Sequence, residues 1–394
     1  MTAPAQVAPL PAAQISAYPL ELLGLAGLLP NEPYTLTPSV SVSEEWNDNI
    51  FLNNVRRQSD FITGVNPGLT LIINQPRLQS TIGASTSSEW YAKETQLNTA
   101  FERASFVANL RYLASPSVTL SMFERFFWHK SSNVASQQGF VVRREETWTN
   151  TFSPGIGVQI TPRTSWDAGV TYGVLRFPGG VGADSDTYGL VTNLNYQFTP
   201  FLSGLVGYEF TFLDFPGQEG QESQTHIPRV GGSYRLTRTL TVSASGGPAF
   251  TIIGGESVVT PAVAASLVQL FPLGSASLSY TRGINPAGAF GGTNDLETFT
   301  ATVALTAYRG LVVAATASYN NAKSVSAAQQ TNQVDAKTFT AGLSVYYQLN
   351  QYVSIFGGYN FLRERTEQGS SINADVDQNR IRVGLQLGYP FGWR

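Results

Sequence analysis

From residue 33 to its end, the chain alternates apolar and polar side chains in short segments separated by turn residues. Residues 338–349 show the pattern clearly. One side of this segment carries Phe339, Ala341, Leu343, Val345, Tyr347 and Leu349, and the other carries Thr338, Thr340, Gly342, Ser344, Tyr346 and Gln348. A period of two is that of a β-strand with one apolar and one polar face. The pattern therefore predicts an all-β chain built from many such strands.

Tight turns recur along the chain at near-constant spacing. They are expected at residues 74–77, 115–117, 161–164, 199–201, 237–239, 271–274, 308–310 and 349–351. Longer loops rich in Gly, Asn, Asp and Gln separate them, as at 178–185 and 216–223. Alternating short turns and longer loops are typical of outer-membrane barrels, whose short turns are periplasmic. We predict a transmembrane antiparallel β-barrel of about 18 strands with longer extracellular loops and both termini in the periplasm.

Composition supports a membrane barrel. Charged residues make up 13% of the chain, about half of the usual ~25%. Mean hydropathy is nevertheless −0.06, and no run of about 18 apolar residues predicts a transmembrane helix. The chain has no cysteine, which excludes disulfides within it. Its net charge of −3 argues against a nucleic-acid partner.

Residues 1–32 differ from the rest of the chain. They are rich in Pro and Ala and contain no Lys or Arg, so the basic start of a secretory signal is missing. We expect that a signal has been trimmed or that the start is misplaced. The segment is then a periplasmic extension, either a disordered tail or a plug at the barrel mouth that could contact a periplasmic partner. The barrel is expected to occupy residues 33–394.

The six tryptophans fall near expected strand ends rather than in mid-strand. Amphipathic indole rings prefer the headgroup zone of a membrane. We therefore assign to two membrane girdles Trp46, Trp90, Trp128, Trp148, Trp166 and Trp393.

The alternation also predicts which side chains line the pore. On residues 99–113, for example, Phe106 and Leu110 are expected to face lipid, which turns Arg103 and Arg111 inward. An Arg on the lipid face at mid-depth costs about 2–4 kcal/mol, so the inward assignment is also the cheaper one. The predicted pore-lining residues are Arg103, Arg111, Arg125, Asp167, Asn193, Asn195, Glu209, Arg229, Arg235, Arg380 and Arg382.

This set holds seven Arg and two carboxylates, which suggests a positive lumen that favours anions. Ordinary pore-lining charge without selectivity is the alternative. The facing of the strands near 117–130 and 353–366 stays ambiguous, because Glu124 and Arg363 fall on their apolar side.

Catalytic chemistry finds little support. The sequence contains no G-x-x-x-x-G-K-[ST], G-x-S-x-G or C-x-x-C-H motif. Its only histidines, His129 and His226, are expected near the outer strand ends, where a catalytic pair would need a Ser or an Asp such as Asp186 or Asp214. Polar girdle or loop positions explain both histidines more simply. We expect no enzyme activity, no metal site and no cofactor.

Two stretches resemble a known family. Ser41-Val-Ser-Glu-Glu-Trp-Asn-Asp-Asn-Ile50 and Ser59-Asp-Phe-Ile-Thr-Gly-Val-Asn-Pro-Gly-Leu69 look like the opening hairpin of bacterial outer-membrane barrels associated with exopolysaccharide or exosortase gene clusters. The close match covers about 30 residues, and it carries over no substrate-binding residue. The resemblance implies an outer-membrane pore that serves polymer secretion. Arg382-Val-Gly-Leu-Gln-Leu-Gly-Tyr389 resembles the signal read by the barrel-assembly machinery, although five further residues follow it.

Three functions are therefore open. The leading hypothesis is a passive conduit for an anionic polysaccharide or another anionic solute. The second is a general diffusion porin, for which residues 132–143 are the longest candidate constriction loop. The third is a scaffold that anchors a partner protein in the lumen. Each of them places the chain in outer-membrane lipid or lipopolysaccharide.

Overall fold

The computed structural model describes residues 32–129, 146–178, 182–218, 220–286, 292–325, 335–366 and 375–393. Most of the expected 1–32 extension and the expected constriction loop at 132–143 lie outside these residues. The described residues form nineteen strands and one short 3₁₀ turn, η1 (Thr95–Leu97). No described helix is long and apolar enough to cross a membrane.

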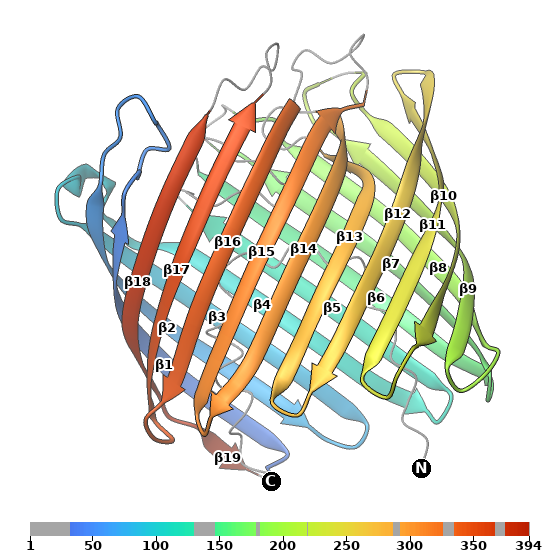
Figure 1. The fold of residues 1–394 in the computed structure, drawn as a ribbon, viewed down its shortest axis with the longest axis horizontal. Helices are drawn as coiled ribbons and strands as arrows, with labels where there is room; N and C mark the ends of the chain where they lie inside the picture. Colours follow the sequence, from blue (N-terminus) through green and yellow to red (C-terminus); the bar gives the residue numbers. More distant parts are fainter. Residues whose placement is uncertain are drawn as a thin grey trace.

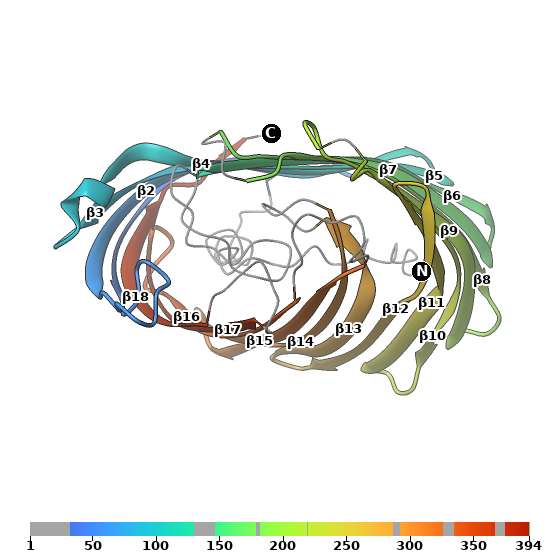
Figure 2. The same cartoon turned by 90° about the horizontal axis from the view of Figure 1, so that it is seen from above.

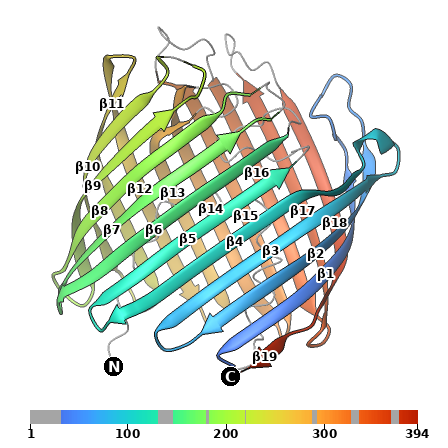
Figure 3. The ribbon, with the colours of Figure 1, turned by 180° about the vertical axis from the view of Figure 1, so that it is seen from behind.

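The first nine strands form the N-terminal half of the sheet (Figure 3). They are β1 (Tyr34–Asn47), β2 (Asp60–Asn74), β3 (Leu78–Tyr91), β4 (Thr99–Ser115), β5 (Val118–His129), β6 (Thr147–Thr161), β7 (Thr164–Arg176), β8 (Ser185–Gln197) and β9 (Leu202–Asp214).

The remaining strands complete the sheet (Figure 1). They are β10 (Ser223–Arg235), β11 (Leu240–Ile253), β12 (Glu256–Phe271), β13 (Gly274–Pro286), β14 (Thr293–Tyr308), β15 (Leu311–Ser324), β16 (Asp335–Gln348), β17 (Val353–Thr366), β18 (Val376–Gly388) and β19 (Phe391–Trp393).

From β1 to β18 each strand pairs antiparallel with its sequence neighbour, and both β18 and β19 pair with β1. Closure pairs the first strand with the last, and in lipid such pairing satisfies the backbone groups of the strands. The prediction of an 18-stranded closed antiparallel barrel is confirmed. Seen from above, the ring is flattened, with β4 and β7 on one long side and β14, β15 and β17 on the other (Figure 2).

The residues after β18 complete the closure. Pro390 interrupts the strand because proline cannot donate to a ladder, and β19 then resumes the pairing with β1. Tyr34 and Trp393 stack at a ring-centroid distance of 5.6 Å. The trailing residues, which the sequence left uncertain, therefore continue the last strand.

All eight predicted tight turns join consecutive strands at one end of the barrel, which we name the turn end. At the opposite loop end the connections are longer, with one exception. β11 and β12 are joined there by Gly254 and Gly255 alone, with φ values of 54° and 89°. A two-residue hairpin turn of this kind requires positive φ, which glycine adopts without steric cost.

Candidate functional site: the inner wall of the barrel

Cross-strand pairing shows which side chains share a face of the sheet. One face carries large apolar groups that are strongly exposed, such as Val206 (66%), Val230 (66%) and Val383 (57%). The other carries small polar groups that are buried, such as Thr35 (2%) and Ser41 (3%). In a closed barrel the concave face is the shielded one, so the polar face is the inner wall. An apolar exterior around a polar interior is the arrangement of a membrane-spanning barrel.

The register places every residue of the predicted pore lining on this inner face. Arg103 pairs with His129, Arg125 with Thr151, and Asp167 with Asn193. The same parity holds for Arg111, Asn193, Asn195, Glu209, Arg229, Arg235, Arg380 and Arg382. What these residues do for transport is a separate question, which their contacts address.

One group of charges lies where β18 and β1 close the barrel. The Arg380 guanidinium donates from Nε (2.8 Å) and from Nη2 (2.9 Å) to the two oxygens of Glu45. Both side chains are largely buried, at 16% and 12% exposure. Arg382 lies two residues further along β18. It donates to the Ser43 hydroxyl (2.9 Å) and lies over the Phe356 ring. Bidentate geometry makes the Arg380–Glu45 pair a strong, directional contact.

A second ion pair joins β3 and β4 near the loop end. Arg103 Nη1 donates to Glu89 Oε1 (2.6 Å), and Arg103 Nε donates to His129 Nδ1 (2.8 Å). The Tyr91 hydroxyl also donates to Glu89 (3.2 Å). The carboxylate therefore neutralises this Arg and is itself fixed by a neighbouring donor.

A third ion pair joins β9 and β10. Arg229 Nη1 donates to Glu209 Oε2 (2.7 Å), and Arg229 Nη2 donates to the Ser245 hydroxyl (3.1 Å). On β7 and β8, both oxygens of Asp167 accept from amides, at 2.9 Å from Asn193 and 2.6 Å from Asn195. Each of these charges is satisfied by the wall itself.

The charge balance inferred from the sequence is wrong in one respect. Seven inward Arg were set against two inward carboxylates, Asp167 and Glu209. The register adds Glu45, Glu89, Asp60, Glu256 and Glu364 to the inner face. The alternation in the sequence could have predicted Glu45 and Glu89, because Trp46 and Trp90 face outward and the residue before each therefore faces inward. Three of the seven Arg are thus paired with acids.

Two of the predicted Arg differ from the rest. The side chains of Arg111 and Arg235 are exposed and make no ion pair or side-chain hydrogen bond to another described residue. Both lie toward the turn end of the inner wall. Arg125, by contrast, is half-buried with its guanidinium carbon 4.7 Å from the centroid of the Phe127 ring. Among the seven predicted Arg, Arg111 and Arg235 are thus the two whose side chains are exposed.

The opposite part of the inner wall is chemically different. From β11 to β16 its only charged residue is Glu256, at the start of β12 beside the loop-end hairpin. Most of the rest are small residues, with hydroxyls bonded across strands, as between Ser243 and Ser266 (2.7 Å). We name this face the hydroxyl wall; its main hydroxyl residues are Ser243, Ser266, Ser277, Ser279, Thr300, Thr302, Thr316, Ser318, Thr340 and Ser344. In Figure 2 its β14 and β15 lie across the lumen from β4 and β7.

The six tryptophans all lie on the outer face, within three residues of a strand end. Trp128 donates to Glu146 (3.0 Å) and Trp166 to Thr192 (2.9 Å). An indole that meets apolar surroundings on one side and a polar partner on the other suits an interface. Their depth in a membrane stays a prediction.

The outer face shows where the apolar band ends. Tyr280, Phe299, Tyr319 and Phe339 form one cross-strand row from β13 to β16. Two residues nearer the loop end, the next outer row is polar, with Arg282, Glu297, Asn321 and Lys337. From Phe299 to Tyr308, β14 rises about 23 Å at a tilt of about 40°, close to the ~25 Å apolar band of such barrels.

The two strands of uncertain facing are resolved by the register. Glu124 lies on the outer face between Ala108 and Phe152. Arg363 also lies there, opposite Phe339, and its Nε is 3.6 Å from Asp377. The two histidines take opposite faces: His129 is on the inner wall, and His226 is on the outer face, 2.6 Å from the Tyr208 hydroxyl.

No family model and no curated protein matches the chain. Among solved structures it resembles OccAB4 of Acinetobacter baumannii at 13% identity, covering 92% of this chain and 99% of that one with a TM-score of 0.44. It also resembles OpdL of Pseudomonas aeruginosa (10%, 91% and 99%, 0.45) and the siderophore receptor PirA of that organism (8%, 92% and 81%, 0.45). Likeness at this level assigns neither a family nor a function.

Proposed function

We propose that this protein is a bacterial outer-membrane pore, a passive conduit for a polysaccharide or another hydrophilic solute. The observation that carries the proposal is the continuous polar inner wall of a closed barrel whose exterior is apolar. Barrels of about 16–18 strands are wide enough for an aqueous channel. Closed barrels with this inside–outside alternation belong to outer membranes. By the same analogy the turn end, where Tyr34 and Trp393 meet, is periplasmic.

The hydroxyl wall supports a carbohydrate as the solute. Ser and Thr hydroxyls both donate and accept hydrogen bonds, as sugar hydroxyls do. Exchange among many equivalent weak partners lets a strand slide without a deep binding site, which conduction requires. The resemblance of the opening hairpin to barrels of exopolysaccharide clusters points the same way.

A preference for anions is proposed as modest. Arg103, Arg229 and Arg380 are each neutralised by a carboxylate within 2.9 Å. Arg111 and Arg235 remain to attract anionic groups near the turn end. A general diffusion porin is the second candidate, because an inner wall that pairs its own charges selects weakly.

Planar-bilayer recording tests the proposal. We expect steady conductance and a reversal potential favouring anions under a salt gradient. The preference should shrink at high salt, because the Debye length falls from about 10 Å at 0.1 M to about 3 Å at 1 M. Arg111→Gln should move the reversal potential toward zero. Lys323→Gln, on the outer face of β15, removes the same charge and should leave it unchanged.

Each outcome has a distinct meaning. Selectivity for cations that is insensitive to Arg111→Gln would reject the anion preference but keep the pore. If the whole chain is closed, a variant lacking residues 1–32 should conduct, as expected for a plug. Absence of conductance in both forms of a folded barrel would reject the pore and favour the scaffold.

A further inference from the structure

The barrel wall has a break between β12 and β13. Elsewhere neighbouring strands pair over nearly their whole length, but here pairing ends at Val263↔Arg282. β12 begins at Glu256 and β13 ends at Pro286, so residues 259–262 and 283–286 face each other without pairing. All eight are described residues. Figure 1 shows the upper part of β13 bending away from β12. We name this break the seam.

Prolines accompany the seam. Pro261 stands on β12 at its edge and pairs with Pro248 on β11. Pairing of β11 with β10 is in turn interrupted where Pro248 meets Pro228. A proline removes one ladder donor and is confined to edges and bulges of sheets. Three prolines at corresponding positions of three adjacent strands each remove one possible ladder donor from this part of the wall.

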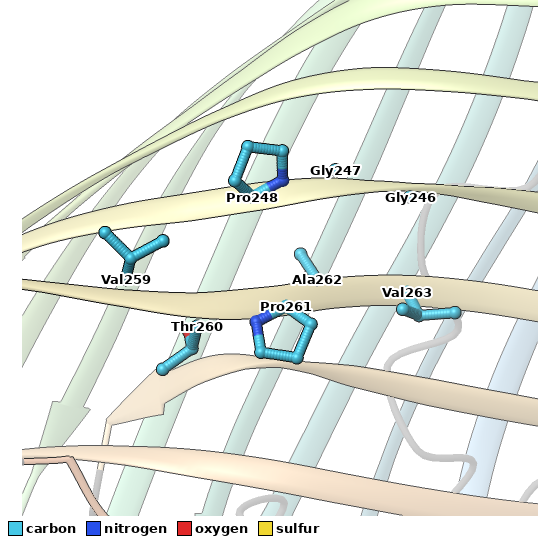
Figure 4. Close-up of a pocket in the computed structure, with 8 residues that line it drawn as sticks. All are labelled: Gly246, Gly247, Pro248, Val259, Thr260, Pro261, Ala262 and Val263. Atoms are coloured by element: carbon cyan, nitrogen blue, oxygen red, sulfur yellow. The ribbon is translucent and has the colours of Figure 1, made fainter.

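A shallow cavity of about 530 Å³ lies at the seam, lined by β11 and β12 (Figure 4). Its lining includes the outer residues Val259 and Pro261 and the inner residues Thr260 and Ala262. Four of the β12 residues that line it, Val259 to Ala262, are those that pair with β11 but with no described residue of β13. The Thr260 hydroxyl oxygen is buried there without a hydrogen-bond partner in the described part of the chain.

The two faces of the sheet beside the seam are both apolar. On the outer face Phe250, Ile252 and Val259 are strongly exposed, at 46%, 41% and 61%. On the inner face the polar pattern is interrupted, and buried Ile227, Ala249 and Ala262 pack together. The last β12–β13 pair before the seam is Val263↔Arg282. It lies two residues beyond Tyr280, at the edge of the apolar band. An occupant that enters from the side therefore comes from the membrane interface at the loop end.

We propose that the seam is a lateral opening that binds the acyl chain of an amphiphile from the loop-end leaflet. The chemistry beside the seam favours this occupant, because the exposed apolar side chains of Val259 and Pro261 stand on its outer face at the membrane interface, and Ile227, Ala249 and Ala262 form an apolar cluster on its inner face. Arg282 stands on the outer face at the end of the β12–β13 pairing, held by Asp295 (2.7 Å) and Glu297 (3.1 Å), so the headgroup would meet a charged cluster. The binding site is separate from the axial passage proposed above and does not depend on it.

Single-cysteine labelling tests the seam, since the chain contains no cysteine of its own. Thr260→Cys is labelled with a bimane fluorophore, and the full chain is reconstituted in phosphatidylcholine vesicles with brominated acyl chains. Ser266→Cys is the matched control, because Ser266 lies on the same strand and the same inner face but is paired on both sides, with Ser243 and Ser279. Ala262→Cys is a second probe of the cavity.

We expect the brominated chains to quench the labels at positions 260 and 262 at least twofold more than the label at 266. Val303→Cys, on the outer face of β14, sets the level for full lipid contact. Equal quenching at 260, 262 and 266 would overturn the proposal. So would quenching at 260 by aqueous iodide alone, which would mean a water-filled window. Cross-linked dimers of the Thr260→Cys variant would also overturn it, since a second copy would then pair with the β12 edge.

Discussion

Glu45 shows how a single inward residue can decide a local charge balance. It follows Glu44 in the sequence, yet only Glu45 points inward, because Trp46 and Glu44 share the outer face. There it meets Arg380 in a bidentate contact and lies near Arg382 and Arg103. Removing one partner from a buried ion pair is costly because the other charge stays buried without compensation.

Glu45→Gln is therefore expected to lower the free energy of unfolding by about 3 kcal/mol, the lower end of the range for breaking a buried ion pair. The measurement is the urea midpoint of unfolding in lipid vesicles. Asp375→Asn is the control, because its pair with Arg365 is exposed (50% and 54%) at the same 2.8 Å N–O distance. An exposed pair contributes about 0–1 kcal/mol. Equal effects of the two changes would show that the Arg380 pair is open to water.

At the scale of elements, the β11–β12 hairpin differs from every other loop-end connection between described strands. The two glycines set the turn, and the strands they join continue past the apolar band with Phe250 and Val259 still facing outward. The loop-end part of β12 is thus paired with β11 on one edge and unpaired with β13 on the other. This asymmetry produces the seam.

Gly255→Ala should destabilise the barrel by about 1–2 kcal/mol, because a Cβ is strained at a φ of 89°. Gly157→Ala is a matched control. Neither added Cβ would meet an atom within 4 Å, but Gly157 has no positive φ. The temperature at which the folded gel band converts to the unfolded one measures both. A drop with Gly157→Ala as large as that with Gly255→Ala would contradict the turn geometry.

At the scale of the whole molecule, an apolar exterior of fixed height surrounds two unlike inner walls. The flattened section brings the hydroxyl wall opposite strands that carry ion pairs (Figure 2). A solute in this lumen meets satisfied charges on one side and exchangeable hydroxyls on the other. The arrangement explains why we expect conduction with only weak selection by charge.

The tryptophans report the depth of the barrel in the membrane. All six should lie at headgroup level, because each stands on the outer face close to a strand end. Lipids brominated near the headgroup should quench the intrinsic fluorescence more than lipids brominated deep in the chain. The same sample should migrate faster on a gel before heating than after it. Stronger quenching by the deep bromines would show that the apolar band is assigned to the wrong height on the barrel.

The sequence by itself determined the strands, their number, their tight turns and the face of most side chains, but not the facing near 117–130 and 353–366. These properties are local, since alternation and turn chemistry act over a few residues. Arg111 and Arg382 were placed inward on that basis, and the register puts them on the inner face. The expected carboxylate count failed because facing was assigned to selected residues rather than to every acid in a strand.

Only the tertiary structure decided which charges meet, how the ends close and where the wall breaks. Arg380 and Glu45 are 335 residues apart in the chain, and no local pattern links them. Closure by Phe391–Trp393 and the seam beside Pro261 depend equally on which strand edge lies next to which. Pairing between distant strands follows from the closed ring as a whole, because each strand must keep its register with the strands on both of its sides.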